Sequence, residues 1–265
     1  MTQSGFDLER LTTEQQEQLI DLLQEEEQYR ARRMFFALYP DGNELWSGPT
    51  NKDFPRGGLI YARGLYPKHL EFFEVGAKYR ERCFMAANRV SKTMGGGGYE
   101  TSCHLTGLYP DWWVGRRFKT PVRVWAAGKT NETTRDIVQA TLLGEVKHGA
   151  RKTVTGTGVI PGDELGMITW KAGVADLVDT IKVRHASGGW STLGLKSYQQ
   201  GRGSFEGTAQ HVIWLDEEPP EDIYGECLIR TATTHGIIML TFTPLMGLSE
   251  VVMYFLPTSA RPGEL

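Results

Sequence analysis

Several classes of protein are excluded by what this sequence lacks. None of its apolar runs approaches the roughly 20 residues that a membrane-spanning helix needs. The first residues, MTQSGFDLER, contain neither the basic nor the apolar segment of a secretory signal. The three cysteines, Cys83, Cys103 and Cys227, are far apart and form no C-x-x-C pair. We therefore expect reduced thiols in a cytosolic protein without a membrane partner.

The sequence also lacks a large excess of positive or negative charge and any metal-binding pattern. The net charge of −3 gives no overall signature of nucleic-acid binding, so any DNA contact has to be local. The six histidines are scattered without metal-ligand spacing, and we expect no zinc site. The rest is ordinary: 265 residues, 40% apolar and 23% charged, are enough for one sizeable domain with its own core.

The N-terminal region is predicted to be helical. TTEQQ at residues 12–16 contains two overlapping capping boxes, and apolar residues follow at helical spacing. One long helix, or two, should run from about residue 13 to Leu38, where Pro40 ends it. Because a loop rich in Gly, Pro and Asn follows, we divide the chain into an N-terminal helical lid region, residues 1–60, and a main domain, residues 61–250.

The main domain alternates between short apolar runs and helical stretches. Strands are predicted at 83–87, 122–127, 211–215 and 237–242, and helices near 92–108, 133–146 and 221–234. This alternation predicts an α/β fold with a mostly parallel central sheet flanked by helices. Residues 180–184 and 192–196 predict an antiparallel hairpin added to that sheet.

The stretch AANRVSKTMGGGG, residues 86–98, has the end of a phosphate-binding loop but not its glycines. Against the pattern G-x-x-x-x-G-K-[ST], Ala86 and Ser91 stand at the two glycine positions, and both are small. In a strand–loop–helix context, Lys92 would reach the β and γ phosphates and the Thr93 hydroxyl would coordinate Mg²⁺. The alternative is an exposed Lys-Thr pair at the start of a helix.

Four glycines, Gly95 to Gly98, follow this loop. We expect them in the first turns of the next helix, where each costs roughly 1 kcal/mol relative to alanine. Such a repeated cost predicts that something passes close to this helix: the sheet, a neighbouring subunit or a nucleotide lid.

Two later strands end in polar side chains. HVIWLDEE, residues 211–218, places Asp216 and Glu217 at a strand tip, where the first would hold Mg²⁺ and the second polarise the attacking water. A solvated acidic turn is the alternative. In LTFTP, residues 240–244, the Thr243 hydroxyl would sense the γ-phosphate, although threonine is also common in ordinary strands. The order of the three sites favours nucleotide hydrolysis.

These segments together resemble a known family. ANRVSKT, GRGSFEGTAQHVIWLDEEPPEDIY and TFTP, with LYPKHLEFF upstream, are similar to the ATPase portion of the tailed-bacteriophage terminase large subunit, over about residues 65–247. The resemblance implies a P-loop NTPase fold with a helical lid. It also implies ATP hydrolysis that drives double-stranded DNA through a portal ring into a preformed capsid. The implied cofactors are ATP and Mg²⁺.

The resemblance also assigns residues. It implies that the nucleotide-binding residues are Ala87, Asn88, Arg89, Val90, Ser91, Lys92 and Thr93, with Tyr66 and His69 on the adenine side. Thr93 and Asp216 would bind Mg²⁺, Glu217 would be catalytic, and Thr243 would couple hydrolysis to movement.

Two positions depart from the family pattern. His69 stands where the family has a glutamine, and Asn88 stands where many members have a mechanistic arginine. Arg89, the next residue, is our catalytic candidate for a contact to the γ-phosphate. Arg202 and Arg230 are alternative charge donors, although an ordinary surface role is favoured for both.

The implied partners are double-stranded DNA, the portal protein, the terminase small subunit and further copies of the chain in a ring on the procapsid, in the host cytoplasm. Residues 112–119 mix aromatic and basic side chains and are a candidate DNA contact, but a packed aromatic corner with solvated basic tips is favoured. The family's nuclease domain has no counterpart here, so we expect no nuclease activity, and residues 251–265 are predicted to begin a linker.

Two alternative functions stay open. One is a helicase-like P-loop ATPase that acts on nucleic acid. The other is a non-catalytic nucleotide-binding assembly module, which the missing loop glycines suggest.

Overall fold

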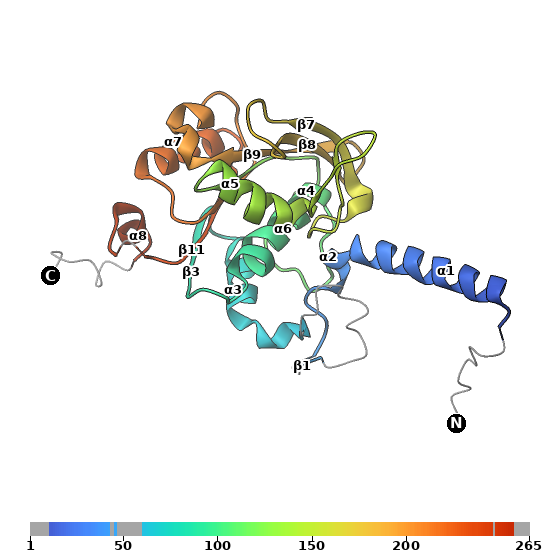
Figure 1. Cartoon of the computed structure of the whole chain (residues 1–265). Helices are drawn as coiled ribbons and strands as arrows, with labels where there is room; N and C mark the ends of the chain where they lie inside the picture. Colours follow the sequence, from blue (N-terminus) through green and yellow to red (C-terminus); the bar gives the residue numbers. More distant parts are fainter. Residues whose placement is uncertain (1–10, 43–44, 47–59, 246, 257–265) are drawn as a thin grey trace.

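A computed structural model describes residues 11–42, 45–46, 60–245 and 247–256. A seven-stranded sheet, in the order β3-β11-β10-β4-β9-β8-β7, forms the centre (Figure 1). Its strands in chain order are β3 (Glu81–Met85), β4 (Arg123–Gly128), β7 (Leu165–Trp170), β8 (Val178–Arg184), β9 (Trp190–Ser197), β10 (Val212–Asp216) and β11 (Ile237–Phe242). Two short antiparallel pairs lie outside it: β1 (Leu45–Trp46) with β2 (Ile60–Tyr61), and β5 (Val146–Lys147) with β6 (Thr153–Val154).

Most of the sheet is parallel. β3, β11, β10, β4 and β9 pair in parallel, whereas β8 and β7 continue the sheet with antiparallel pairing. The predicted α/β fold with a mostly parallel sheet is therefore confirmed. The predicted hairpin is β8–β9, with the difference that β9 also pairs in parallel with β4. β7 was not predicted from the sequence, because its side chains alternate only weakly between exposed and half-buried.

Helices cover both faces of the sheet. Along β10, Val212 and Trp214 belong to a core shared with α3 (Pro67–Val75), α4 (Tyr99–Thr106) and α6 (Ala140–Leu143). Ile213 and Leu215 belong to the opposite core, with α7 (Glu221–Ala232) and α8 (Glu250–Phe255). The shorter helical segments are η3 (Arg63–Leu65), η4 (Lys92–Gly98), α5 (Asn131–Thr133), η5 (Thr134–Gln139), η6 (Gly162–Glu164), η7 (Tyr198–Gln200) and η8 (Arg202–Phe205). Because side chains alternate along a strand, each central strand contributes to both cores.

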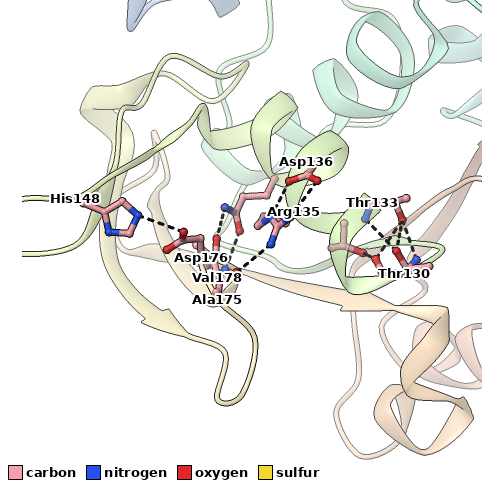
Figure 2. Close-up of polar contacts among 10 residues, drawn as sticks. Thr130, Thr133, Arg135, Asp136, His148, Ala175, Asp176 and Val178 are labelled. Carbon is pink, nitrogen blue, oxygen red and sulfur yellow. Dashed lines mark hydrogen bonds and ion pairs between the residues drawn. The ribbon is translucent and has the colours of Figure 1, made fainter.

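The continuous helical stretch α5–η5–α6 is fastened to the loop before β8 (Figure 2). A reciprocal capping box of Thr130 and Thr133 begins it. Gln139 donates to the Asp176 carbonyl at 2.8 Å and accepts from the Val178 N–H at 2.7 Å. Arg135 adds a bond to the carbonyl of residue 175. These contacts fix the β8–β9 hairpin relative to the centre of the sheet.

The N-terminal region is divided differently from the predicted boundary at residue 60. α1 (Thr13–Ala31) has no buried residue and projects from the body (Figure 1). In α2 (Met34–Ala37), however, Phe35 is buried and stacks on Tyr99 with ring centres 4.9 Å apart. Tyr39 is also buried and donates to the Gly95 carbonyl at 2.6 Å. Residues 34–39 therefore belong to the main core, while residues 43–44 and 47–59 lie outside the described residues.

The predicted linker also begins too early. Residues 250–255 form α8, and Val251 and Val252 are buried against the second core. The main domain therefore extends to at least Phe255, and residues 257–265 lie outside the described part. Within the described ranges, no helix has both the length and the apolar character needed to cross a membrane.

The glycine run lies against the sheet. Gly95 to Gly98 occupy η4, a π-helical turn that follows the loop after β3. A Cβ on Gly97 would lie 2.1 Å from Nε1 of Trp214 on β10, and a Cβ on Gly96 would lie 3.2 Å from the Phe84 ring on β3. The expected close approach is thus confirmed, and the sheet is what approaches the helix.

Candidate active site

The predicted site residues lie at one edge of the sheet, at or after the ends of three neighbouring strands. β3, β11 and β10 are neighbours and run parallel, so their carboxyl ends lie side by side. The loop with Lys92 and Thr93 follows β3, Asp216 is the last residue of β10, and Thr243 directly follows β11. Residues separated by up to about 150 positions therefore meet, as expected for a ligand site at strand ends in an α/β sheet.

Lys92 lies at the junction of the first and third segments. It is buried, and its Nζ donates to Thr243 Oγ1 at 2.8 Å and to the Ala87 carbonyl at 3.3 Å. The Thr243 hydroxyl is in turn 2.9 Å from both the Ala86 carbonyl and Asn88 Oδ1. Among the described residues, no carboxylate forms an ion pair with Lys92. Its charge is therefore available to an anionic ligand.

The loop before Lys92 has an unusual backbone. Arg89 and Ser91 have φ angles of 65° and 60°, in the left-handed region that favours glycine. For a residue with a side chain this conformation costs roughly 1–2 kcal/mol. The Ser91 carbonyl accepts the amides of Gly95 and Gly96 at 2.8 and 3.1 Å. The loop pattern usually has glycine at the position of Ser91, because glycine adopts a positive φ without strain. Ser91 adopts the same backbone conformation and bears the strain.

Asp216 is a buried carboxylate without a cationic partner among the described residues. Its Oδ1 accepts hydrogen bonds from Thr93 Oγ1 at 3.0 Å and Thr241 Oγ1 at 2.7 Å. Thr241 Oγ1 accepts in turn from Trp214 Nε1 at 2.7 Å. Burial raises the pKa of Asp216 to about 6, against the opposing effect of the two hydroxyls and, more weakly, Lys92. The site thus concentrates negative charge where a cation would be stabilised.

Glu217 differs from its neighbour in exposure and backbone. It is half-buried, whereas Asp216 is 2% exposed. Its φ is 65°, its N–H donates to the Thr241 carbonyl at 3.0 Å, and its own carbonyl accepts from the Tyr198 hydroxyl at 3.0 Å. The two adjacent acids therefore have different environments, which suits two different roles.

The second predicted part of the site is a pocket beside the loop. A cavity of about 370 Å³ is lined by residues 65–69 and 89–91, which brings Tyr66, His69 and Arg89 together. His69 Nε2 lies 3.4 Å from the Ser91 carbonyl. Burial lowers the pKa of His69 in spite of hydrogen bonds to the backbone of Ser91 and Val90. His69 is therefore expected to be neutral near pH 7, and it contacts the loop at the Ser91 carbonyl.

The alternative arginines are not at this site. Arg202 and Arg230 each lie 2.9 Å from the carboxylate of Glu226 on α7, so both arginines are paired with this one residue. In residues 112–119, Trp113 is buried and Arg116 lies over the Phe118 ring at 5.0 Å. This geometry is that of the packed aromatic corner favoured by the sequence.

Three residues of the site were not predicted from the sequence: Thr241, Trp214 and Tyr198. Thr241 could have been found, because it lies two positions before Thr243, and in extended chain residues two apart point to the same side. Trp214 looked like ordinary core, and its bond to Thr241 depends on the pairing of β10 with β11. Nothing in the local sequence indicates the contact of Tyr198.

The donor set fits a magnesium ion. Mg²⁺ prefers oxygen ligands from one or two carboxylates together with substrate phosphates and water. Asp216 and Thr93 present such oxygens beside each other, and the raised pKa of Asp216 indicates a carboxylate that lacks a compensating positive charge. These two residues would hold the ion.

Comparison with known proteins gives consistent results. The family model described as "Terminase large subunit, T4likevirus-type, N-terminal" matches residues 83–262. The large terminase subunit of Salmonella phage P22 is 36% identical over 273 residues, which cover 96% of this chain and 48% of that protein. The chain thus spans about half the length of this curated relative.

Two solved structures also show similarity. The large terminase ATPase domain of Thermus phage P74-26, in a mutant form, is 11% identical with a TM-score of 0.44, over 63% of this chain and 61% of that one. The large terminase of a second, thermophilic bacteriophage, in complex with ADP, is 14% identical with a TM-score of 0.44, over 66% and 37% of the two chains. On the family model and the phage P22 relative, the chain belongs to the terminase large subunit family.

Proposed function

We propose that this chain is the ATP-hydrolysing motor of a terminase large subunit and powers the translocation of double-stranded viral DNA into a procapsid. The observation that carries the proposal is the meeting of Lys92, Thr93 and Asp216 at the carboxyl edge of the sheet. An ammonium on residue 92, a hydroxyl on residue 93 and a carboxylate that accepts from that hydroxyl are the groups that hold a nucleoside triphosphate with Mg²⁺.

The positions of the side chains define the binding step. Residues 87–93 surround the phosphates, and Lys92 contacts the β and γ phosphates. Asp216 and Thr93 would hold Mg²⁺, which would neutralise charge on the phosphates. Tyr66 and His69 border the cavity that receives the base. Arg89 lines the same cavity and is the candidate for a contact to the γ-phosphate.

Glu217 acts in the hydrolysis step. Its half-buried carboxylate directly follows Asp216 and accepts a proton from the attacking water.

Thr243 acts as the coupling residue. A γ-phosphate competes with the Thr243 hydroxyl for the Lys92 ammonium, which donates to that hydroxyl at 2.8 Å. Release of that bond is the proposed signal by which Thr243 couples nucleotide binding to movement.

Two substitutions test the proposal. Lys92→Ala should abolish ATP binding, whereas Glu217→Gln should keep binding and lower turnover by about 10²- to 10⁴-fold, the contribution of a general base. Fluorescent-nucleotide titration and release of labelled phosphate measure the two effects, at protein concentrations that favour self-association. Lys78→Ala and Glu206→Gln, two exposed positions outside the site, are the matched controls.

Unchanged nucleotide affinity in Lys92→Ala would contradict the phosphate-loop assignment. Normal hydrolysis by Glu217→Gln would remove Glu217 as the catalytic residue. Nucleotide binding without turnover by the wild-type assembly would instead favour a non-catalytic module.

The wider role follows from the proposed motor. The partners are double-stranded DNA, the portal protein, the terminase small subunit and further copies of the chain in a ring on the procapsid, in the host cytoplasm. The ATPase core comprises residues 61–250 together with the α2 segment and α8, which pack on it. Strand separation by the purified protein would point to a helicase-like ATPase instead.

A further inference from the structure

Tyr198 reaches the active site from a distant strand. It directly follows β9, which is separated from β10 by β4. Its ring is buried beside Phe205, with ring centres 6.5 Å apart. Its hydroxyl lies 2.9 Å from the Asp216 carbonyl and 3.0 Å from the Glu217 carbonyl. The single hydroxyl proton of Tyr198 is thus shared by the two acidic residues of the site, through their backbone.

The Glu217 backbone is held on both sides. Its N–H donates to the Thr241 carbonyl on β11 at 3.0 Å, and its carbonyl accepts from Tyr198. Between these bonds Glu217 has a φ of 65°, a left-handed conformation that persists only where the surroundings impose it. Because φ contributes to the direction in which the side chain leaves the backbone, the two bonds fix the direction of the Glu217 Cα–Cβ bond, from which the carboxylate extends.

The segment that carries Tyr198 is itself fixed. Ser197 Oγ donates to Asn131 Oδ1 at 2.8 Å, and the Gln199 N–H donates to the Lys129 carbonyl at 3.1 Å. The Asn131 N–H donates to Gln199 Oε1 at 3.3 Å. Residues on both sides of Tyr198 are therefore bonded to Lys129 in the turn after β4 or to Asn131 at the start of α5, which fixes the position of the Tyr198 backbone.

We propose that Tyr198 is a positioning residue that holds Glu217 in the conformation required for hydrolysis. This inference rests on the proposed catalytic role of Glu217. The Tyr198 hydroxyl bonds to the backbone of the two acids and leaves their carboxylates untouched, so it acts through Glu217 and contributes to turnover without contributing to nucleotide binding. The β8–β9 hairpin thus contributes to the catalytic site through Tyr198, the residue that follows β9.

Tyr198→Phe tests this, because it removes one oxygen and keeps the buried ring. In the assembled protein with ATP and Mg²⁺, kcat should fall by about 10- to 100-fold, the penalty of a small misplacement of a catalytic group. The KM for ATP should change by less than about twofold, since binding contacts are retained. Tyr109→Phe is the matched control: its hydroxyl accepts from the Phe118 N–H at 2.7 Å and lies 3.0 Å from His104 Nδ1, away from the site.

A double-mutant cycle separates positioning from a general loss of structure. In single-turnover measurements, Tyr198→Phe should slow hydrolysis in the wild-type background but not in a Glu217→Gln background, because the group that it positions is already inactive. An equal loss in both backgrounds, a kcat within about twofold of wild type, or a loss that Tyr109→Phe reproduces would each overturn the proposal. Absence of hydrolysis by the wild-type assembly would contradict the proposed function instead.

Discussion

Two buried carboxylates, Glu100 and Asp216, show how differently the chain treats charge in its interior. Glu100 is 0% exposed and Asp216 is 2% exposed. Glu100 has a charged partner, Arg82, with good geometry, whereas the described residues offer the Asp216 carboxylate only hydroxyl donors. A buried charge is costly unless it is paired, so the two residues require different explanations.

Glu100 is compensated within the chain. Arg82 on β3 donates to both of its oxygens, at 2.7 and 3.0 Å, and His104 Nε2 lies 3.1 Å from the same carboxylate. Burial alone would raise the pKa of Glu100, but Arg82 and His104 hold it below its ordinary value. This network ties α4 to the edge strand of the sheet and has a structural role.

Asp216 is compensated only in part. Two hydroxyls stabilise its carboxylate, yet burial still raises its pKa from the ordinary 3.8 to about 6. The difference teaches that the fold pairs the Glu100 charge internally, whereas the described residues leave the Asp216 charge without a cationic partner. A raised carboxyl pKa at the strand ends, close to a buried lysine, indicates function more than stability.

The largest effect should come from breaking the Glu100 network. Arg82→Ala leaves a fully buried carboxylate without its main partner and should lower the free energy of unfolding by about 3–5 kcal/mol. Urea denaturation measures the change. Arg184→Ala, which removes an exposed pair with Glu164 at 2.7 Å, should leave stability almost unchanged. Equal losses in the two variants would show that burial does not decide the cost.

A substitution of Asp216 should have the opposite sign. The folded protein holds the Asp216 proton more tightly than the unfolded chain, so this group's contribution to stability is present below about pH 4 and is lost as the pH rises through about 6. Asp216→Asn removes the buried charge and keeps an oxygen for the two hydroxyls. Without nucleotide, the variant should be more stable than wild type by roughly 3 kcal/mol at pH 8, and by about half as much at pH 5.

Denaturation curves at the two pH values check this prediction, with Glu100→Gln as the contrast. The pKa of Glu100 is lowered, so its contribution to stability is present above its ordinary range and is lost as the pH falls. Between pH 5 and pH 8 the stability difference from wild type should therefore grow for Asp216→Asn and stay nearly constant for Glu100→Gln, whose pH dependence lies below about pH 4.5. A destabilised Asp216→Asn at pH 8 would mean that Asp216 is compensated within the chain after all.

The contrast between strand-end residues such as Asp216 and internally paired residues such as Glu100 also separates what the sequence predicts from what it does not. Lys92, Thr93, Asp216 and Thr243 were predictable because each lies at or just after the end of an apolar strand, and parallel strands present their carboxyl ends at one edge. The pattern of apolar runs was sufficient for the central strands for the same reason. No contact between distant residues had to be known.

The remaining features depend on tertiary neighbours. Arg82 and Glu100 are ordinary charged residues until the fold packs α4, which carries Glu100, against β3, which carries Arg82. Tyr198 reaches β10 only because β9 lies two strands away and ends at the same edge. β7 is a half-exposed edge strand that contains Gly166, and its pattern is too weak to identify it. Residues 251–255 resembled a linker because their apolar partners on α7 come from elsewhere in the chain.

The smallest effect should come from the hydroxyl that links Trp214 to Asp216. Thr241→Val keeps the shape of the side chain but leaves the buried Trp214 N–H without its acceptor, and it should lower stability by about 2 kcal/mol. It also removes one of the two hydroxyl donors to Asp216, which should raise the pKa of that carboxyl further and shift the onset of magnesium-dependent nucleotide binding to higher pH. Binding titrations from about pH 5.5 to 8 measure the shift, with Thr234→Val, a hydroxyl bonded to the Gln210 carbonyl outside the site, as control. If Thr241→Val lost stability without any shift in the pH dependence of binding, Thr241 would serve the core alone, and the hydroxyls around Asp216 would not tune its charge.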